Sequence, residues 1–169
     1  MKVPYDAEIG LILFIFLTLG IIKYLSLKPS NKRIWVDDNK NLASAEFEGD
    51  EVIIKNIRDF KWRTSRDYDQ RWVIKKFNMK EVCKIWFFLE YFDTKKRQMA
   101  HTIMSFEFED GSRISCSIEV RREPGEKYHP IRGLFQKYEL IYIWATERDS
   151  IGVRSMCRKK SVTHLFEAV

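Results

Sequence analysis

The chain has 169 residues, which suits one folded domain plus a short additional segment, because domains typically contain about 100–200 residues. Hydrophobic residues make up 45% and aromatic residues 14%, so the composition supports a packed core and excludes an intrinsically disordered chain. The formal net charge is +6, but 30 basic residues are interspersed with 24 acidic ones, which argues against a one-sign stripe for nucleic acid and predicts no nucleic-acid partner.

The first predicted element is an apolar helix near the N-terminus. Ile9 to Ile22 carries no charged residue, and extended to Leu27 the segment has about 19 residues, which at about 1.5 Å per residue spans roughly 28 Å. The hydrocarbon core of a bilayer is about 30 Å thick, so such a helix can cross it. Lys23 can extend its ammonium group to the interface, where Tyr24 adds an aromatic anchor. We assign residues 1–28 to a transmembrane anchor and expect a single-pass membrane protein.

Two properties of the anchor leave alternatives open. A cleaved signal peptide is also apolar, but Asp6 and Glu8 before the helix, and the lack of a clear small-x-small cleavage site after it, favour a retained anchor. Positive charges are fewer before the helix, where there are only Lys2 and the amino terminus, than after it, where there are Lys23, Lys28, Lys32 and Arg33. Taken alone, the positive-inside rule places the domain in the cytoplasm.

Beyond a short polar linker at residues 29–32, the domain at residues 33–158 has mostly the pattern of short strands. The predicted strands cover residues 43–48, 51–57, 71–77, 84–91, 101–108, 113–121 and 140–146. The nearly continuous apolar run at 84–91 is typical of a central strand, and Gly49-Asp50 and Asp110-Gly111 suit hairpin turns. Pro130 to Glu139 suits a short helix, and residues 159–169 form a tail too short to classify. The expected fold class is α+β, an antiparallel β-rich domain with one N-terminal transmembrane helix.

The cysteines and two of the histidines show no pattern of a metal site. Cys83, Cys116 and Cys157 form no CxxC pair and no even framework, so we expect neither structural zinc nor a disulfide scaffold. His129 precedes a proline in a predicted loop, His164 lies in the tail, and no cluster with metal-ligand spacing accompanies them. We therefore expect no metal and no cofactor.

The hairpin around Asp110-Gly111 permits two registers. A two-residue turn pairs polar with apolar residues across the strands. A three-residue loop, with Gly111 in the left-handed position of a G1 bulge, shifts the pairing by one residue. The apolar pairs are then Phe106 with Ile114, Met104 with Cys116 and Thr102 with Ile118, and the polar pairs include Glu107 with Arg113 and Ser105 with Ser115. Because register follows the apolar face, we prefer the three-residue loop, although it leaves Ile103 opposite Ser117.

This register places His101 opposite Glu119, with Cβ atoms about 5 Å apart. A carboxylate there can accept a hydrogen bond from one imidazole nitrogen, fix the tautomer and leave the other nitrogen as a base. A surface ion pair without catalytic function is the alternative. The candidate catalytic residues are His101 and Glu119, while Cys116 lies on the opposite face among apolar residues and is not a nucleophile for His101.

Several segments of the chain resemble the Lnb N-terminal periplasmic domain family, a bacterial domain of unknown function. Its matching segments are Ile57-Arg58-Asp59-Phe60, Ala100-His101-Thr102 with Ser105-Phe106, Asp110-Gly111, Ser117-Ile118-Glu119-Val120-Arg121-Arg122-Glu123, Gly133-Leu134-Phe135, Tyr138-Glu139-Leu140-Ile141-Tyr142 and Glu147-Arg148-Asp149. The resemblance runs from about Arg33 to about Arg158, and the order and spacing of the segments make it specific.

The family resembles permuted papain-like thiol enzymes, in which a strand histidine acts with a cysteine at a helix N-terminus, and its named member is a lipoprotein acyl-transferring enzyme. The resemblance implies a partial permuted papain-like fold, with the family's histidine at His101 and its acidic motif at Glu119. The implied reaction is thiolate attack on an acyl carbonyl, with histidine as the base and a carboxylate that orients it. The resemblance also implies an extracytoplasmic domain on the cytoplasmic (inner) membrane, which we favour over the charge count, and a membrane lipid or lipoprotein as candidate partner.

The family's cysteine is expected in an Asn-Cys-Thr motif well after the Glu-Arg-Asp segment. The printed sequence contains no such motif, and Cys157 lies between Met156 and Arg158. We therefore expect a C-terminally truncated domain that resembles a thiol acyltransferase or hydrolase, lacks the nucleophilic cysteine and is inactive as it stands. The alternative is a non-catalytic, membrane-tethered binding module.

Overall fold

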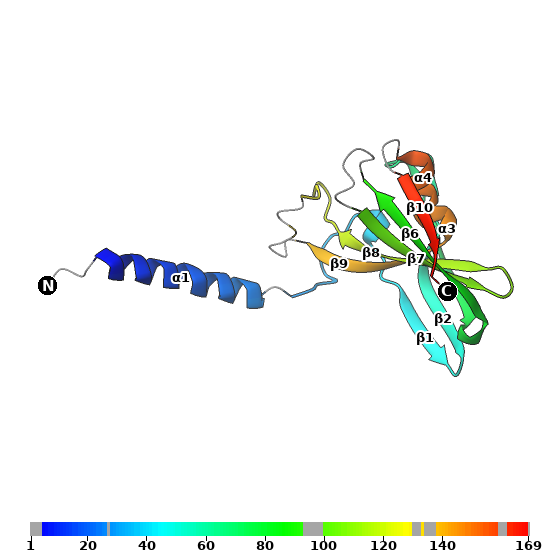
Figure 1. Cartoon of the computed structure of the whole chain (residues 1–169), viewed down its shortest axis with the longest axis horizontal. Helices are drawn as coiled ribbons and strands as arrows, with labels where there is room; N and C mark the ends of the chain where they lie inside the picture. The colour runs from blue at the N-terminus through cyan, green and yellow to red at the C-terminus, as the bar shows by residue number, and fades with distance from the viewer. Residues whose placement is uncertain are drawn as a thin grey trace.

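The computed structural model describes residues 5–26, 28–92, 100–129, 133, 138–158 and 162–168, and it shows a long N-terminal helix that stands apart from a β-rich domain (Figure 1). The helix α1 runs from Tyr5 to Ser26. Apolar side chains are exposed all along it, for example Phe14 at 66% and Phe16 at 70%. Such a helix is suited to a lipid environment, and its segment Ala7–Ser26 is long and apolar enough to cross a membrane.

The domain is built on one mostly antiparallel sheet, which confirms the expected α+β class. Its strand order is β1-β2-β9-β8-β7-β6-β10, and β5 pairs with β2 outside this path. The strands are β1 Ser44–Glu48, β2 Glu51–Arg58, β5 Trp72–Asn78, β6 Val82–Tyr91, β7 Ala100–Phe108, β8 Arg113–Arg121, β9 Glu139–Ala145 and β10 Val162–Glu167. A separate two-stranded ribbon is formed by β3 Lys61–Trp62 and β4 Tyr68–Asp69.

The short helices connect the strands. Two 3₁₀ helices cover Asp37–Asn39 and Met79–Glu81, and two short α-helices follow β9, α3 at Glu147–Ser150 and α4 at Gly152–Cys157. The side chain of Thr146 caps α3 by accepting the backbone N–H of Asp149, a common N-terminal signal. The helix expected over Pro130 to Glu139 lies mostly outside the described residues, and Glu139 itself begins β9.

The seven predicted strands are present; the strand at 113–121 has the predicted bounds, and the ends of the others differ by at most two residues. The run at 84–91 lies inside the sheet as β6, between β7 and β10. The unclassified tail contributes β10, which pairs antiparallel with β6 from Val162 opposite Tyr91 to Glu167 opposite Trp86. β6 therefore has a hydrogen-bonded strand on each side, while most of its side chains are half-buried.

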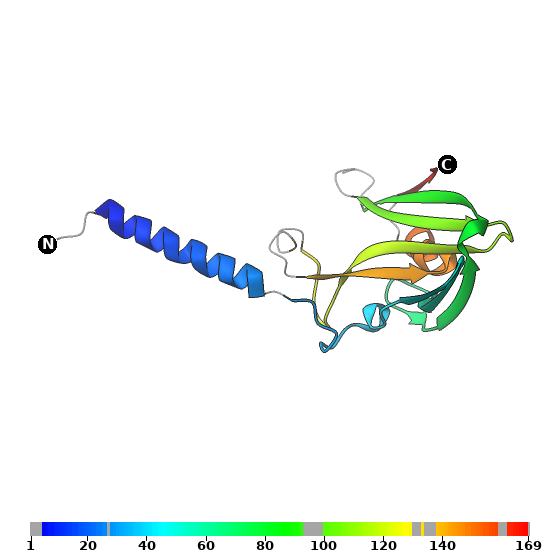
Figure 2. The ribbon, with the colours of Figure 1, turned by 90° about the horizontal axis from the view of Figure 1, so that it is seen from below.

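The β7–β8 hairpin has the predicted register. Met104 pairs with Cys116 and Phe106 with Ile114, and Gly111 has the positive φ of 77° that the three-residue loop requires. The ladder ends at Ile103 opposite Ser117. Beyond that point the two strands separate (Figure 2), so the expected cross-strand pairs nearer the open end do not form as ladder pairs.

A bulge in β2 redirects that strand toward the middle of the sheet. Its register with β5 shifts between Ile54 and Ile57, and Asn56 between them has a positive φ of 58°, a conformation that asparagine tolerates better than most residues. The Asn56 side chain donates to the Leu42 carbonyl at 2.8 Å. After the bulge, Arg58 pairs in parallel with Ala145 of β9, which places Arg58 beside the helices that follow β9.

Candidate functional site

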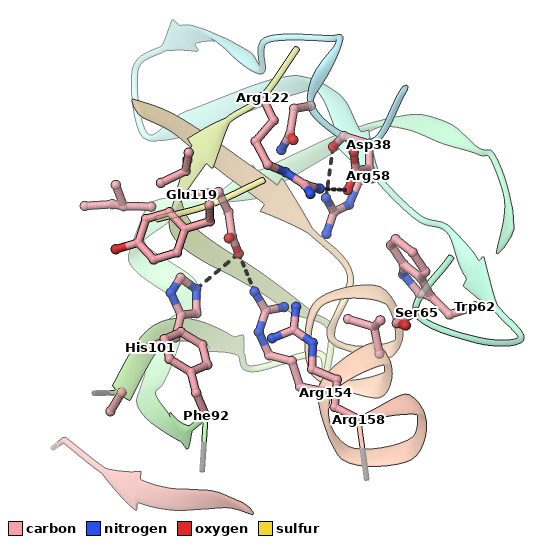
Figure 3. Close-up of a pocket in the computed structure, with 16 residues that line it drawn as sticks. Asp38, Arg58, Trp62, Ser65, Phe92, His101, Glu119, Arg122, Arg154 and Arg158 are labelled. Atoms are coloured by element: carbon pink, nitrogen blue, oxygen red, sulfur yellow. Dashed lines mark hydrogen bonds and ion pairs between the residues drawn. The ribbon is translucent and has the colours of Figure 1, made fainter. Parts of the chain in front are cut away.

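The two predicted catalytic residues meet at the end of the sheet where β7 and β8 separate. His101 is the second residue of β7, and Glu119 lies near the end of β8. His101 Nε2 lies 3.1 Å from Glu119 Oε1, with side chains 14% and 24% exposed respectively (Figure 3). The side chains therefore bridge the gap between two strands whose backbones are no longer paired. Sequence reasoning correctly placed the two residues together, although it expected a ladder pair.

Glu119 is held by two further residues. Arg154 of α4 donates from Nη2 to the same carboxylate oxygen, and the Ser117 hydroxyl donates to it at 3.1 Å. Burial alone would raise the pKa of Glu119, but the close contact with His101 and the positive charge of Arg154 outweigh burial and hold this pKa well below its usual range. Glu119 is therefore a carboxylate at neutral pH.

A buried carboxylate on β6 extends this network. Glu90 is fully buried and pairs with His101 in the β6–β7 ladder. Its oxygens contact Arg154 Nε at 2.9 Å and Arg158 Nη1 at 3.0 Å. The resulting order is His101, Glu119, Arg154, Glu90 and Arg158, in which positive or ionisable groups alternate with carboxylates. Such alternation is what allows charges to remain buried.

Sequence reasoning missed Arg154, Glu90 and Arg158. Glu90 is a single carboxylate within an otherwise apolar strand run, and a buried carboxylate requires a buried cationic partner. Arg154 was hidden because α4 was not predicted, although the Thr146 cap marks the start of the preceding helix.

A second buried network lies beside the first and joins two of the segments that carry the family resemblance. Asp149 accepts hydrogen bonds from Arg58 Nε at 3.0 Å and Nη2 at 3.0 Å. It also accepts the Phe60 backbone N–H at 2.8 Å and the Trp62 indole N–H at 2.9 Å. The adjacent Asp59 accepts from Thr146 and Arg148, each at 2.7 Å. The bulged end of β2 is thereby fastened to α3.

Both networks border one cavity of about 430 Å³. Its lining includes His101 and Glu119 from β7 and β8, and Arg154 and Arg158 from α4 and the residue after it (Figure 3). Further polar lining residues are Asp38, Asn39, Arg58, Trp62, Ser65 and Arg122. Each of the four arginines is paired with a carboxylate, so the wall is polar but has no excess positive charge. Guanidinium groups can donate to a ligand with a carbonyl, carboxylate or phosphate group.

The cysteines lie away from this wall. Cys116 is buried on the other face of the sheet, where it pairs with Met104 and Trp144, and burial raises the pKa of its thiol to about 11. Cys83 is exposed near the start of β6 and Cys157 is partly buried at the end of α4. Of the described residues that line the cavity, none is a cysteine.

The other histidines are separate from His101. His164 lies on β10 and makes an edge contact with the Tyr91 ring, with centroids 5.7 Å apart, and the backbone N–H of His129 donates to the Tyr138 hydroxyl at 3.0 Å. Within the described ranges, no group of three or more His, Cys, Asp or Glu residues is arranged to hold a metal ion.

Comparison with known proteins identifies one family. The model of the Lnb N-terminal periplasmic domain matches residues 68–165, a span that includes His101, Glu119 and Arg154. No curated protein and no solved structure matches the chain. The periplasmic family together with the single N-terminal apolar helix supports a membrane-anchored protein with an extracytoplasmic domain. The chain belongs to the Lnb N-terminal periplasmic domain family.

Proposed function

We propose that this chain is a membrane-anchored extracytoplasmic domain of the thiol acyltransferase or hydrolase type, in which His101 and Glu119 supply the base. The observation that carries the proposal is the 3.1 Å contact between His101 Nε2 and Glu119 Oε1 at the wall of a cavity. A histidine oriented by a carboxylate is the arrangement that activates a nucleophile in acyl transfer.

In this proposal each member of the site has its own function. His101 Nε2 lies 3.1 Å from Glu119 Oε1, and in the proposed site the carboxylate holds the proton on Nε2 and leaves Nδ1 with its lone pair. Among the described residues, Nδ1 has no hydrogen-bond partner, so it is available to take a proton from a thiol or water that attacks an acyl carbonyl, and to return it to the leaving group. Arg154 is a positioning residue because it acts on the reaction through Glu119.

The described contacts thus provide the proton acceptor of the reaction, whereas the nucleophile has to be found among the cysteines or water. Cys116 is excluded as a nucleophile by its position on the other face and by a pKa of about 11. Cys157 is adjacent in sequence to Arg158, which lines the cavity. The absence of a cysteine among the described lining residues favours the second candidate, a tethered module that binds an acyl-bearing or anionic ligand without turnover.

Hydrolysis of short-chain p-nitrophenyl esters and thioesters by the full chain in nanodiscs tests the proposal. We expect His101→Ala to lower the rate by about 100-fold or more, as loss of a general base does, and Glu119→Gln to lower it in the same direction. His164→Ala is the matched control because this strand histidine lies outside the cavity lining. The variant Cys157→Ser distinguishes the two possible nucleophiles: hydrolysis is lost if the Cys157 thiol attacks the substrate and is retained if water does.

The two candidates predict different results. If the wild-type chain releases no product above the empty-nanodisc rate, while a non-hydrolysable acyl phosphate analogue still binds, the chain is a binding module and the proposal of an enzyme is wrong. If His101→Ala and His164→Ala have equal rates, His101 is not the base.

A further inference from the structure

A short tether fixes one end of the sheet close to the membrane helix. α1 ends at Ser26, and the backbone N–H of Ser30 already donates to Glu139 Oε1 at 2.9 Å. Four residues span at most about 14 Å when fully extended. Asn31 Oδ1 then accepts from Arg121 Nη1 at 2.7 Å. Glu139 and Arg121 face each other at the start of β9 and the end of β8, so this end of the sheet stays near the membrane surface.

The cavity is lined by residues from the same end of the sheet. β7 begins at Ala100, opposite Tyr91 at the end of β6, and β8 ends at Arg121. His101 and Glu119 lie within two residues of these strand ends. Both views of the ribbon show α1 joined to this end of the domain, while the β7–β8 turn lies at the other end (Figures 1 and 2).

Exposed apolar side chains gather around this end and form what we call the apolar collar. Its members, with their exposed fractions, are Ile34 at 79%, Leu140 at 69%, Tyr128 at 52%, Ile118 at 49% and Phe92 at 42%. Phe92, Ile118 and Tyr128 also line the cavity. By strand alternation Ile118 and Leu140 lie on the Cys116 face, while Phe92 lies beside His101 with ring centroids 6.5 Å apart, so the apolar collar surrounds this end of the sheet on both faces. Tyrosine is enriched where a protein meets the headgroup layer.

The charges around the apolar collar complement a lipid surface. Lys28, Lys32 and Lys127 are exposed near it, and basic side chains of this kind are attracted to anionic headgroups. Two nearby carboxylates are each paired with Arg33 at 3.7 Å, Glu139 at 14% exposed and Glu123 at 39% exposed. The turn at the far end is instead polar and acidic, with Glu109 and Asp110 exposed. The end that carries the apolar collar therefore also carries exposed lysines close to α1.

We propose that the apolar collar docks on the surface of the bilayer that α1 spans, so that the cavity opens onto the lipid headgroups. The bilayer is favoured over a second copy of the chain because the tether keeps lipid within reach of the apolar collar at all times. The inference goes beyond the proposed chemistry, since docking needs only the tether and the exposed side chains and holds whether or not the site turns over a substrate.

Depth-dependent fluorescence quenching tests the docking. Single-cysteine variants Leu140→Cys and Tyr128→Cys of the full chain, with Cys83 and Cys157 replaced by serine and Cys116 by alanine, are labelled with an NBD fluorophore in vesicles of phosphatidylcholine and phosphatidylglycerol. Phe47→Cys and Asp110→Cys are the controls. Phe47 is as exposed as the collar residues, at 66%, but lies next to the β1–β2 turn, which points away from α1 (Figure 1).

We expect blue-shifted emission and several-fold stronger quenching by doxyl-labelled lipid at Leu140 and Tyr128 than at either control. Equal quenching at all four positions overturns the docking. So does a blue shift at the apolar collar that rises with the protein-to-lipid ratio, because that result assigns the surface to a second copy.

The unmodified chain provides an independent measurement, which covers the case in which the cysteine substitutions impair folding. Phospholipid with a photoactivatable diazirine in the headgroup region is incorporated in the same vesicles, and cross-linked peptides are identified by mass spectrometry. We expect cross-links in the peptides containing Tyr128 and Leu140 and none in the peptide containing Phe47. Cross-links confined to peptides of α1 overturn the docking.

Discussion

Asp149 is the anion on which the Arg58 network converges, and neutralising it tests whether that network stabilises the fold. In the variant Asp149→Asn the side chain keeps its shape but loses its charge and replaces one acceptor oxygen with a donor amide. That amide would then face donors only: the Arg58 guanidinium, the Phe60 backbone N–H and the Trp62 indole N–H. Arg58 would remain buried at 4% exposure without its counter-charge.

The expected cost follows from the burial. Asp149 is 0% exposed, and removal of one partner from a buried ion pair typically destabilises a protein by about 3–5 kcal/mol. For a domain of this size that loss corresponds to a fall in melting temperature of roughly 10–20 °C. Because small domains have only about 5–15 kcal/mol of stability, Trp62→Phe serves as a milder variant. It removes one donor to Asp149 and should cost about 1 kcal/mol.

Thermal melts followed by circular dichroism, on the full chain in detergent micelles, measure both variants. The matched control is Asp67→Asn, which neutralises an aspartate paired with Arg63 at 2.6 Å on the surface, where the two side chains are 56% and 49% exposed. We expect no measurable change for this control, because exposed pairs contribute little. If Asp149→Asn melts at the same temperature as Asp67→Asn, burial does not determine the strength of this network and the reasoning is refuted.

Three further predictions concern the site and its surroundings. Because the pKa of Glu119 is lower in the folded chain than its ordinary 4.5, its stabilising contribution is complete above that pH and is lost as the pH falls below it. In a plot of unfolding free energy against pH, the slope at acidic pH should therefore be smaller for Glu119→Gln than for the wild type. One titrating proton contributes at most about 1.4 kcal/mol per pH unit to that slope, and an unchanged slope contradicts the prediction. Iodoacetamide at about pH 8 should alkylate exposed Cys83 and spare Cys116, whose thiol is buried and has a pKa of about 11; peptide mass spectrometry would show the reverse order if the assignment is wrong. His101→Ala should change stability by no more than about 1 kcal/mol, because Glu119 keeps Arg154 and Ser117 as partners; an unfolded variant in thermal melts would make His101 a core residue.

The parts of the fold that sequence could predict are those fixed by short-range patterns. The β7–β8 register follows from the requirement that Phe106, Met104 and their partners share one face, and the positive φ of Gly111 supports the same loop. His101 and Glu119 could be placed together by counting residues from that turn. Their contact is therefore a local consequence of one hairpin.

The rest depends on contacts between distant parts of the chain. Arg154 meets Glu119 only because α4 packs beside β8, and a helix of six residues leaves little periodic signal. The separation of β7 from β8 after Ile103, which creates the cavity, has no counterpart in the apolar pattern of either strand. Composition and spacing indicate which residues a strand carries, but not where two paired strands separate.

The site depends on the register that the β7–β8 hairpin adopts. Side chains alternate between the faces of a strand, so a shift of β8 by one residue along β7 would exchange the faces of β8. Glu119 would then point away from His101, and Ile118 or Val120 would take its place, while Cys116 would change to the face that carries Ser105 and Ser115. The same shift would remove Ile114 and Cys116 from the apolar face, so the packing of that face opposes it. Residues inserted into the turn at 109–111 should therefore enlarge the loop and leave the contact between His101 and Glu119 in place.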